Sequence, residues 1–325
     1  MDKAFKVIPL VLISIFGLYF SFKNINFNDV YYKIINIDTL YLFFSVVLLF
    51  ISVLLRSMRL QYVITPINSR ITLNHSFSST MIGYFGNGIL FFRLGEVLKA
   101  YSISKNNKIK VSESFGVIML ERIIDAGSLL LLIILALPWM PLSNSSIRIW
   151  IISFSIVTLF IIIVILLLKK INWMNLISSL SIISDSKKNK LVKLINNVFH
   201  GIGSLKNNQY LNRIVISTIG IWICYFIMTI FLIYACNIDI TLFEIYITLI
   251  IGAVIIAVPA LPGGLGTYEA GITYAMMILF SISKDEALTY ALISHSANYF
   301  PFLAVGAICF IFSGLSIKDI NKGII

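Results

Sequence analysis

Residues 114–137 read SFGVIMLERIIDAGSLLLLIILAL, an apolar run that contains Glu121, Arg122 and Asp125 in its first half. About 20 mostly apolar residues in a helix are enough to span the hydrocarbon core of a bilayer. An ionised side chain near the centre of such a helix costs about 2.5–3.5 kcal/mol on insertion scales, so charges there face the inside of a bundle and pair. The run therefore predicts a membrane-spanning helix with a charged inner face.

The whole chain has the composition of a membrane protein. Of its 325 residues, 59% are hydrophobic and 12% are charged, whereas a soluble domain contains about 25% charged residues. A water-soluble globular protein is therefore excluded. Further apolar runs lie at 7–22, 40–55, 149–168, 214–236, 242–258 and 286–312. Two less apolar stretches, interrupted by polar residues, lie at 71–92 and 259–281. We expect residues 1–325 to form one integral membrane domain, an all-α, polytopic transmembrane helix bundle.

The basic residues predict the orientation of this bundle. The loop at residues 169–213 contains several lysines and only one acid, Asp185, and basic loops remain in the cytoplasm. The net charge of +11 is therefore explained by topology and not by binding to nucleic acid. Counting spans from this loop places Arg56, Arg59 and Arg70 in the cytoplasm, together with both termini. We expect a multi-pass protein of the cytoplasmic (inner) membrane.

The loop at 169–213 also carries a regular apolar pattern. Between its lysines, apolar residues recur at helical spacing: Leu191, Leu194, Ile195, Val198 and Phe199. Such a mixture of basic and apolar faces is typical of a helix that lies along a membrane surface. We therefore expect a cytoplasmic loop that contains an amphipathic surface helix.

Two glycine-interrupted stretches fit the count of spans if each enters the membrane and leaves it again on the side from which it entered. Residues 71–92 begin and end on the cytoplasmic side, and residues 242–281 begin and end outside. Non-helical backbone at membrane depth needs protein or water around it, so two broken segments from opposite faces predict a shared internal site. Paired segments of this kind are typical of inverted-repeat transporters. Whether 71–92 and 259–281 are re-entrant or crossing is left open by the sequence.

The first candidate site follows the glycine-rich residues 83–88. Arg93, Glu96 and Lys99 stand at i, i+3 and i+6, so they share one face if the segment is helical. One interpretation is a cationic pocket for a phosphate, in which Glu96 orients Arg93 or carries a proton. The alternative is a solvated helix start in a cytoplasmic loop.

The second candidate site is the charged group inside 114–137. Arg122 and Asp125 can pair at i, i+3, while Glu121 shares a face with Asp125. Ionisable residues inside a membrane mark functional sites by default, which favours an inward-facing functional network. A structural ion pair near the cytoplasmic end of the helix is the alternative.

The third candidate site reads PALPGGLGTYE over residues 259–269. Its prolines and glycines break any helix, and Thr267 is expected to cap the helix that follows. The free N–H groups at Gly263 and Gly264 suit a phosphate, and Glu269 is either a proton carrier or a partner of the helix dipole. A structural kink is the alternative reading.

A lone histidine adds a further candidate. His295 lies in the apolar run 286–312, close to Ser294, Ser296 and Asn298. Because histidine side chains can change charge near neutral pH, His295 is a candidate for charge coupling. The alternative is a packing residue whose hydrogen bonds are satisfied within the core.

Five motifs occur in the order seen in one family. They are RSMR at 56–59, FGN at 85–87, RLGE at 93–96, ERIID at 121–125 and PGGLGTYE at 262–269. In this combination the chain resembles, over nearly its whole length, the flippase-like transmembrane domain of lysylphosphatidylglycerol synthases. That domain occurs alone or fused to a soluble aminoacyl-transferase domain, as in the multiple peptide resistance factors, where it is associated with moving lysyl-lipid between leaflets. We expect a stand-alone member without the aminoacyl-transferase domain.

The chain departs from the family pattern at two positions. Phe91 stands where the family usually has a proline before its Arg-x-Gly-Glu element, and His295 stands near a position that is often arginine. The first departure is expected to alter the bend of the stretch at 71–92. The second removes a permanent cation, so a pH-sensitive site or a differently charged substrate is compatible with this sequence.

The hypothesis that these residues favour is translocation of a lipid between leaflets. The lipid is an anionic or aminoacylated phospholipid, or a polyprenyl-phosphate-linked glycolipid. The predicted headgroup-binding residues are Arg93, Glu96, Arg122, Gly263, Gly264 and Thr267, and the predicted charge-coupling residues are Glu121, Asp125, Glu269 and His295. The alternatives are a membrane-embedded transferase and an accessory subunit that binds a lipid-modifying enzyme. The sequence contains neither an Asp-x-Asp pair nor a His-Glu-x-x-His motif, so no metal, cofactor or catalytic residue is predicted.

Overall fold

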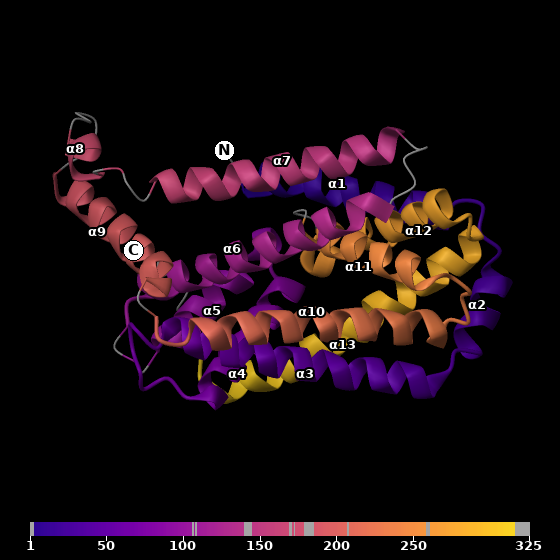
Figure 1. Ribbon diagram of the computed structural model, residues 1–325, viewed down its shortest axis with the longest axis horizontal. Helices are drawn as coiled ribbons and strands as arrows, with labels where there is room; N and C mark the ends of the chain where they lie inside the picture. Colours follow the sequence, from indigo (N-terminus) through magenta and orange to yellow (C-terminus); the bar gives the residue numbers. More distant parts are fainter. Residues whose placement is uncertain are drawn as a thin grey trace.

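The chain folds as a bundle of α-helices (Figure 1). The computed structural model describes residues 3–105, 107, 109–139, 145–168, 171, 173–178, 185–206, 208–257 and 261–315. These residues contain no strand, which confirms the predicted all-α class. Three of their helices are long and apolar enough to cross a membrane: α3 (Thr39–Ile64), α10 (Leu211–Ala235) and α13 (Lys284–Phe312).

Helices α3 and α10 pack side by side as an antiparallel pair (Figure 1). At one end the side-chain amide of Asn208 donates to the carbonyl of Tyr62 over 3.0 Å. At the other end the N–H of Asp38 donates to the carbonyl of Ala235 over 2.9 Å. The Asp38 carboxylate also accepts the N–H groups of the first turn of α3, which caps that helix.

The remaining long helices run along this pair. Helix α6 (Val111–Ala136) ends in a short 3₁₀ turn, η2 (Leu137–Trp139), and α7 (Ser145–Leu168) returns along it (Figure 1). Helix α1 (Lys3–Phe22) packs on the second half of the chain, and the short α2 (Phe27–Ile35) follows it. The predicted run 149–168 is thus part of one helix, α7.

The first glycine-interrupted stretch forms a helical hairpin. Helix α4 (Leu73–Ile89) and helix α5 (Gly95–Ser104) form a hairpin, joined at its tip by the 3₁₀ turn η1 (Phe91–Arg93). A hydrogen bond of 2.9 Å between the hydroxyls of Ser79 and Ser102 connects the two arms toward the open end. The stretch predicted at 71–92 therefore extends to the end of α5, and its tip carries the first candidate site.

The second glycine-interrupted stretch forms a hairpin of the same kind. Helix α11 (Leu242–Ala257) enters, and helix α12 (Thr267–Phe280) returns beside it after the 3₁₀ turn η4 (Pro262–Gly264). Pro259 and Ala260 lie outside the described residues. Three tip glycines have positive φ values: Gly263 (71°), Gly264 (83°) and Gly266 (83°). Positive φ is readily adopted by glycine, so these residues break the helix as predicted.

The two hairpins point toward each other from opposite ends of the bundle, and their tips lie side by side (Figure 1). The first half of the chain has the order α3, hairpin, α6, and the second half has the order α10, hairpin, α13, with each direction reversed. This is the arrangement of an inverted repeat. The hydroxyl of Tyr299 on α13 joins the two halves by donating to the carbonyl of Gly88 over 3.0 Å.

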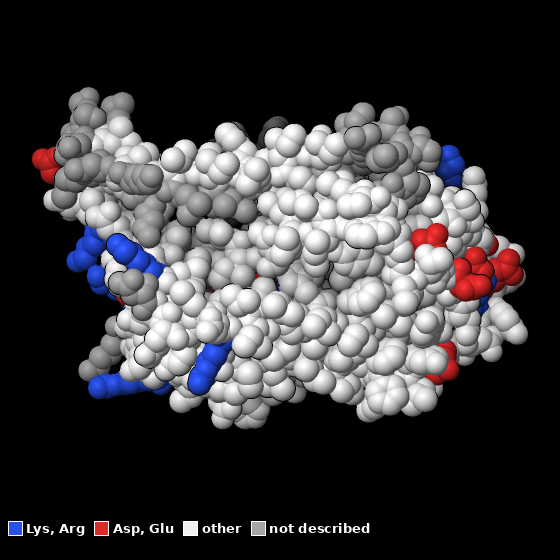
Figure 2. Space-filling model, in the orientation of Figure 1, with Lys and Arg blue, Asp and Glu red and all other residues white. Residues whose placement is uncertain are grey.

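Charge is distributed unequally between the two ends of the bundle. We call the end at residues 203–210 the basic end and the end at residues 236–241 the acidic end. Figure 2 shows lysine and arginine side chains gathered around α9 at the basic end and acidic side chains gathered at the opposite end, near α2. Basic loops remain cytoplasmic, so we continue to expect the basic end in the cytoplasm.

The loop at 169–213 contains α8 (Trp173–Ser178), α9 (Asp185–Ile202) and the turn η3 (Gly203–Leu205). Helix α9 packs directly on α6, where Gly116 meets the backbone of Val198. Its lysine-flanked apolar face remains half open, because Leu191 and Leu194 are about two-fifths exposed (41% and 42%). The loop thus contains a helix with a partly exposed apolar face, and its contact with a membrane surface stays a prediction.

The close approach of α4 and α5 gives the first testable prediction. A Cβ atom on Gly95 would overlap the carbonyl oxygen of Gly83 and the backbone N–H of Asn87. Gly95→Ala is therefore expected to destabilise the protein by about 1–3 kcal/mol, the usual cost of overpacking, and to lower its melting temperature in detergent. Gly127→Ala is the matched control, because a Cβ on this α6 glycine meets nothing within 4 Å. Equal melting temperatures for the two variants would contradict this packing.

Candidate functional site

The charges of α6 lie near the middle of that helix and point into the bundle. Arg122 Nη1 lies 3.5 Å from Asp125 Oδ2, as the i, i+3 spacing predicted. Glu121 is fully buried and contacts Lys99 Nζ of α5 at 2.7 Å. Glu121 and Asp125 also share Arg59 of α3, whose Nη2 lies 3.9 Å from one carboxylate and 2.7 Å from the other. The predicted inward-facing network is therefore present.

The arginines of α3 correct the sequence-based topology. We predicted Arg56 and Arg59 in a cytoplasmic loop, but both are buried inside α3. Arg56 Nη1 lies 2.6 Å from Asp125 Oδ2, and its Nη2 donates to the hydroxyl of Tyr225 over 3.1 Å. The apolar run resumes after Arg59, and that was the available signal that the helix continues to Ile64.

The first candidate site divides between two environments. Glu96 was expected to orient Arg93, but its Oε1 lies 3.2 Å from Arg122 Nη2 and 3.4 Å from the side-chain amide of Asn87. Lys99 is buried against Glu121 and is not part of a solvated helix start. Both residues therefore belong to the same network as the α6 charges.

This network carries more positive than negative charge. Its seven ionisable residues are four cations and three carboxylates: Arg56, Arg59, Lys99 and Arg122 with Glu96, Glu121 and Asp125. One positive charge is therefore unbalanced within the group. The side chain of Arg122 is 33% exposed, whereas that of Arg59 is completely buried. The surplus charge is thus most accessible at Arg122, on the side of the network that faces Glu96.

Arg93 occupies the tip of the first hairpin, outside α5. Phe92 and Arg93 both have left-handed backbone conformations, with φ values of 58° and 54°. This turn removes Arg93 from the face of α5 and lets its guanidinium donate to the carbonyl of Ile256, at the end of α11. Among the described residues, no ion pair neutralises Arg93. A second cation therefore lies where the two hairpin tips meet.

The tip of the second hairpin engages two of its own N–H groups, those of Gly264 and Gly266. Helix α12 begins after Gly266, so the predicted cap at Thr267 is wrong. The Gly266 N–H donates to Glu269 Oε2 over 2.6 Å, and the Thr267 hydroxyl donates to the carbonyl of Gly264 over 2.9 Å. The Gly264 N–H donates to the carbonyl of Leu261 over 2.8 Å. These three donors are therefore engaged within the tip.

Glu269 and His295 form the polar centre of the second tip. His295 Nδ1 lies 2.5 Å from Glu269 Oε1, and Nε2 lies 2.9 Å from the carbonyl oxygen of Gly263. A carbonyl can only accept, so Nε2 carries a hydrogen, and one further proton is shared between Nδ1 and the carboxylate. The ring of His295 also packs against Tyr268 and Tyr299. His295 is therefore bound to the tip and to Glu269, and not only packed in the core.

The predicted residues thus fall into two connected groups at the meeting point of the hairpins. Glu96, Glu121, Arg122 and Asp125 join the buried network, and the other tip holds the remaining candidates: Gly263, Gly264, Thr267, Glu269 and His295. Arg93 bridges the two through Ile256. No group of three or more His, Cys, Asp and Glu residues suited to a metal occurs in the described part of the chain.

Comparison with known proteins identifies the family. The family model described as the lysylphosphatidylglycerol synthase TM region matches residues 7–306. Neither the curated proteins nor the solved structures contain a match to this chain. The family match and the apolar helices together establish a membrane protein of a lipid-related process. The chain belongs to the family of lysylphosphatidylglycerol synthase transmembrane regions.

Proposed function

We propose that this protein moves a phosphate-bearing lipid between the leaflets of the cytoplasmic membrane. The substrate class is an anionic or aminoacylated phospholipid, or a polyprenyl-phosphate-linked glycolipid. One observation carries the proposal: a buried network with a surplus cation lies where two helical hairpins meet from opposite ends of the bundle. A surplus cation inside a membrane domain is costly alone and is stabilised when an anion binds beside it.

The exposed cations are the proposed headgroup ligands. Arg122 and Arg93 each present a guanidinium that suits bidentate contact with a phosphate. Glu96 Oε1 lies 3.2 Å from Arg122 Nη2, and this ion pair would fix the direction of the guanidinium. The phosphate would thereby be held between the network and the tip of the first hairpin, with lipid tails directed outward along the exposed apolar faces of the helices.

The second tip supplies the proposed proton-holding group. Glu269 and His295 share one proton across their 2.5 Å contact, and His295 also holds the carbonyl of Gly263. A change in the protonation of this pair would alter the hydrogen bonds of the glycine-rich tip, which faces the tip that carries Arg93. We propose that the pair couples proton binding to the movement of one hairpin against the other.

Reconstitution into liposomes tests the proposed function. Vesicles receive fluorescently labelled phosphatidylglycerol, lysyl-phosphatidylglycerol or a polyprenyl-phosphate-linked glycolipid, and chemical quenching of the outer leaflet reports movement between leaflets. We expect movement of at least one of these lipids to be faster than in protein-free vesicles and in vesicles that contain an unrelated helical membrane protein. Rates equal to both controls for all three lipids would refute translocation. An accessory role would then be examined by co-purification of a lipid-modifying enzyme.

A further inference from the structure

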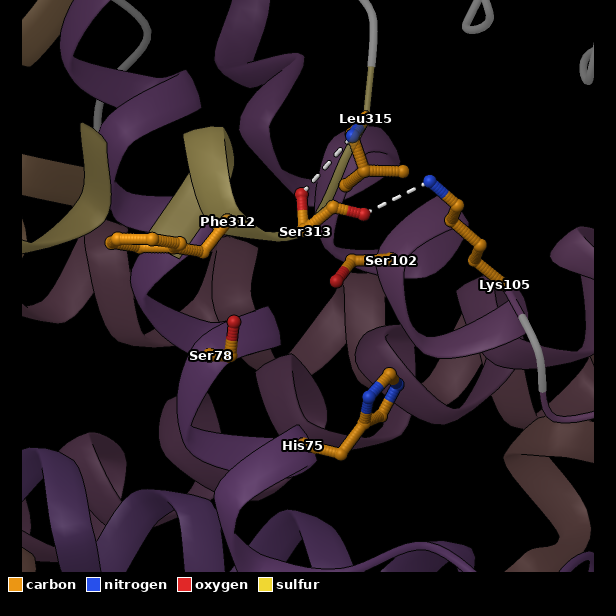
Figure 3. A pocket seen from close by; sticks show the side chains of 7 residues that line it. All are labelled: His75, Ser78, Ser102, Lys105, Phe312, Ser313 and Leu315. Carbon is orange, nitrogen blue, oxygen red and sulfur yellow. Dashed lines mark hydrogen bonds between the residues drawn. The ribbon is translucent and has the colours of Figure 1, made fainter. Parts of the chain in front are cut away.

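A cavity of about 260 Å³ lies at the basic end of the bundle, apart from the hairpin tips. Figure 3 shows it between α4, α5 and the end of α13. Its polar lining consists of His75 and Ser78 on α4, Ser102 and Lys105 at the end of α5, and Ser313 after α13. Since α5 rises about 1.5 Å per residue, Lys105 stands roughly 15–18 Å along the hairpin from its tip. This cavity is therefore distinct from the site at Arg93 and Arg122.

The lining has the chemistry of an anion site. The described residues around the cavity include no Asp or Glu, and they offer one ammonium group, one imidazole and three hydroxyls. Lys105 Nζ donates to the carbonyls of Ser313 and Gly314 over 2.9 and 2.7 Å. Both acceptors are neutral, so the ammonium charge is not compensated by them. An ammonium group has three N–H donors, which leaves one for a ligand.

The polar groups are held in place by their neighbours. The Asn107 amide contacts His75 Nε2 at 2.9 Å, and the hydroxyl of Ser102 is fixed by Ser79 at 2.9 Å. The two carbonyl contacts of Lys105 connect α5 to the end of α13. A ligand here therefore meets groups whose positions are already set, which reduces the entropy lost on binding.

The volume of the cavity limits the size of its ligand, and the residue at its edge indicates where an apolar part of the ligand would lie. Sites for drug-sized molecules occupy about 300–1,000 Å³, so 260 Å³ suits a phosphate group with a small substituent and not a whole lipid. Phe312 stands at the edge of the cavity and is 86% exposed. An apolar side chain beside a cationic cavity at a membrane edge matches a headgroup whose tails remain in the bilayer.

We propose that this cavity binds a phosphate group at the basic end, either in the headgroup of a phospholipid or as free phosphate. The inference rests on the cavity, on the absence of carboxylates among the described residues that line it, and on the ammonium group of Lys105, whose two acceptors are neutral carbonyls. It does not depend on the proposed translocation. Hydroxyls and an ammonium group donate charge-assisted hydrogen bonds that suit phosphate oxygens.

Binding to the detergent-purified full-length chain tests the proposal. The probes are inorganic phosphate and short-chain dihexanoyl phosphatidylglycerol, each titrated by calorimetry. His75→Gln/Lys105→Gln removes the imidazole and the ammonium group, while glutamine can still donate to the carbonyls that Lys105 now contacts. We expect this double variant to bind about tenfold or more weakly, the loss typical of a charge-assisted contact. Lys110→Gln is the matched control, because Lys110 lies at the same end and contacts Asn197 outside the cavity.

Each outcome has a fixed meaning. Binding of both probes, weakened only by the double variant, supports a free-phosphate site, and binding of phosphatidylglycerol alone supports a lipid-headgroup site. An equal loss in Lys110→Gln, or no binding of either probe, overturns the proposal. Ser78→Phe, which fills the cavity without changing charge, should also abolish binding while the melting temperature stays near that of the unmodified chain. Arg93→Gln should leave this binding intact even where it stops translocation, so the two proposals fail separately.

Discussion

Asp125→Asn is expected to destabilise the protein by about 3–5 kcal/mol, the cost of removing one partner from a buried ion pair. Asp125 is the carboxylate that Arg56, Arg59 and Arg122 share, at 2.6, 2.7 and 3.5 Å. Asparagine keeps the shape of the side chain but leaves four cations against two carboxylates in the network. We expect a much lower melting temperature in detergent and a reduced yield from membranes.

A surface carboxylate provides the control for this change. Asp185 on α9 lies 3.3 Å from Lys188, and its side chain is 94% exposed. Exposed i, i+3 pairs contribute little to stability, so Asp185→Asn should melt close to the unmodified protein. If Asp125→Asn and Asp185→Asn melted at the same temperature, the buried network would not be what stabilises the contact between α3 and α6.

The α6 charges could be predicted from sequence because the reasoning is local. A span of apolar residues that contains Glu121, Arg122 and Asp125 must turn them inward, whatever surrounds it. Their main partners on α3 could not be found in the same way. A count of apolar residues ends a span at the first charge, whereas burial of Arg56 and Arg59 depends on carboxylates that another helix supplies.

At the tip of the second hairpin, too, some features follow from the local sequence and others from contacts with distant residues. The helix break at residues 262–266 follows directly from proline and glycine. The glycine at the N-cap position of α12, Gly266, lies at a distant contact, because a Cβ atom there would overlap the backbone of Ser14 in α1. Nothing near Gly266 in the sequence indicates that α1 passes so close. Hydrogen bonding of His295 to Glu269 is likewise a contact between two helices, α13 and α12.

Arg93→Gln is expected to slow lipid movement in liposomes by about ten- to a hundredfold, the factor that corresponds to the loss of a hydrogen bond from a charged group. Arg93 is the cation whose removal should affect the fold least. It lies at a hairpin tip outside the ion pairs of the described residues, and glutamine can still donate to the carbonyl of Ile256. The change therefore separates the proposed binding of a headgroup from the structural role of the buried network.

Arg70→Gln is the matched control, because Arg70 is an exposed cation at the basic end, far from the tips along the hairpin. Both variants should melt within the error of the unmodified protein, and only Arg93→Gln should lose transport. Arg93→Lys should recover part of the rate, since an ammonium group keeps the charge but lacks the planar, bidentate geometry of a guanidinium. Full transport in Arg93→Gln would remove Arg93 from the headgroup site and leave Arg122 as the cation available to a phosphate.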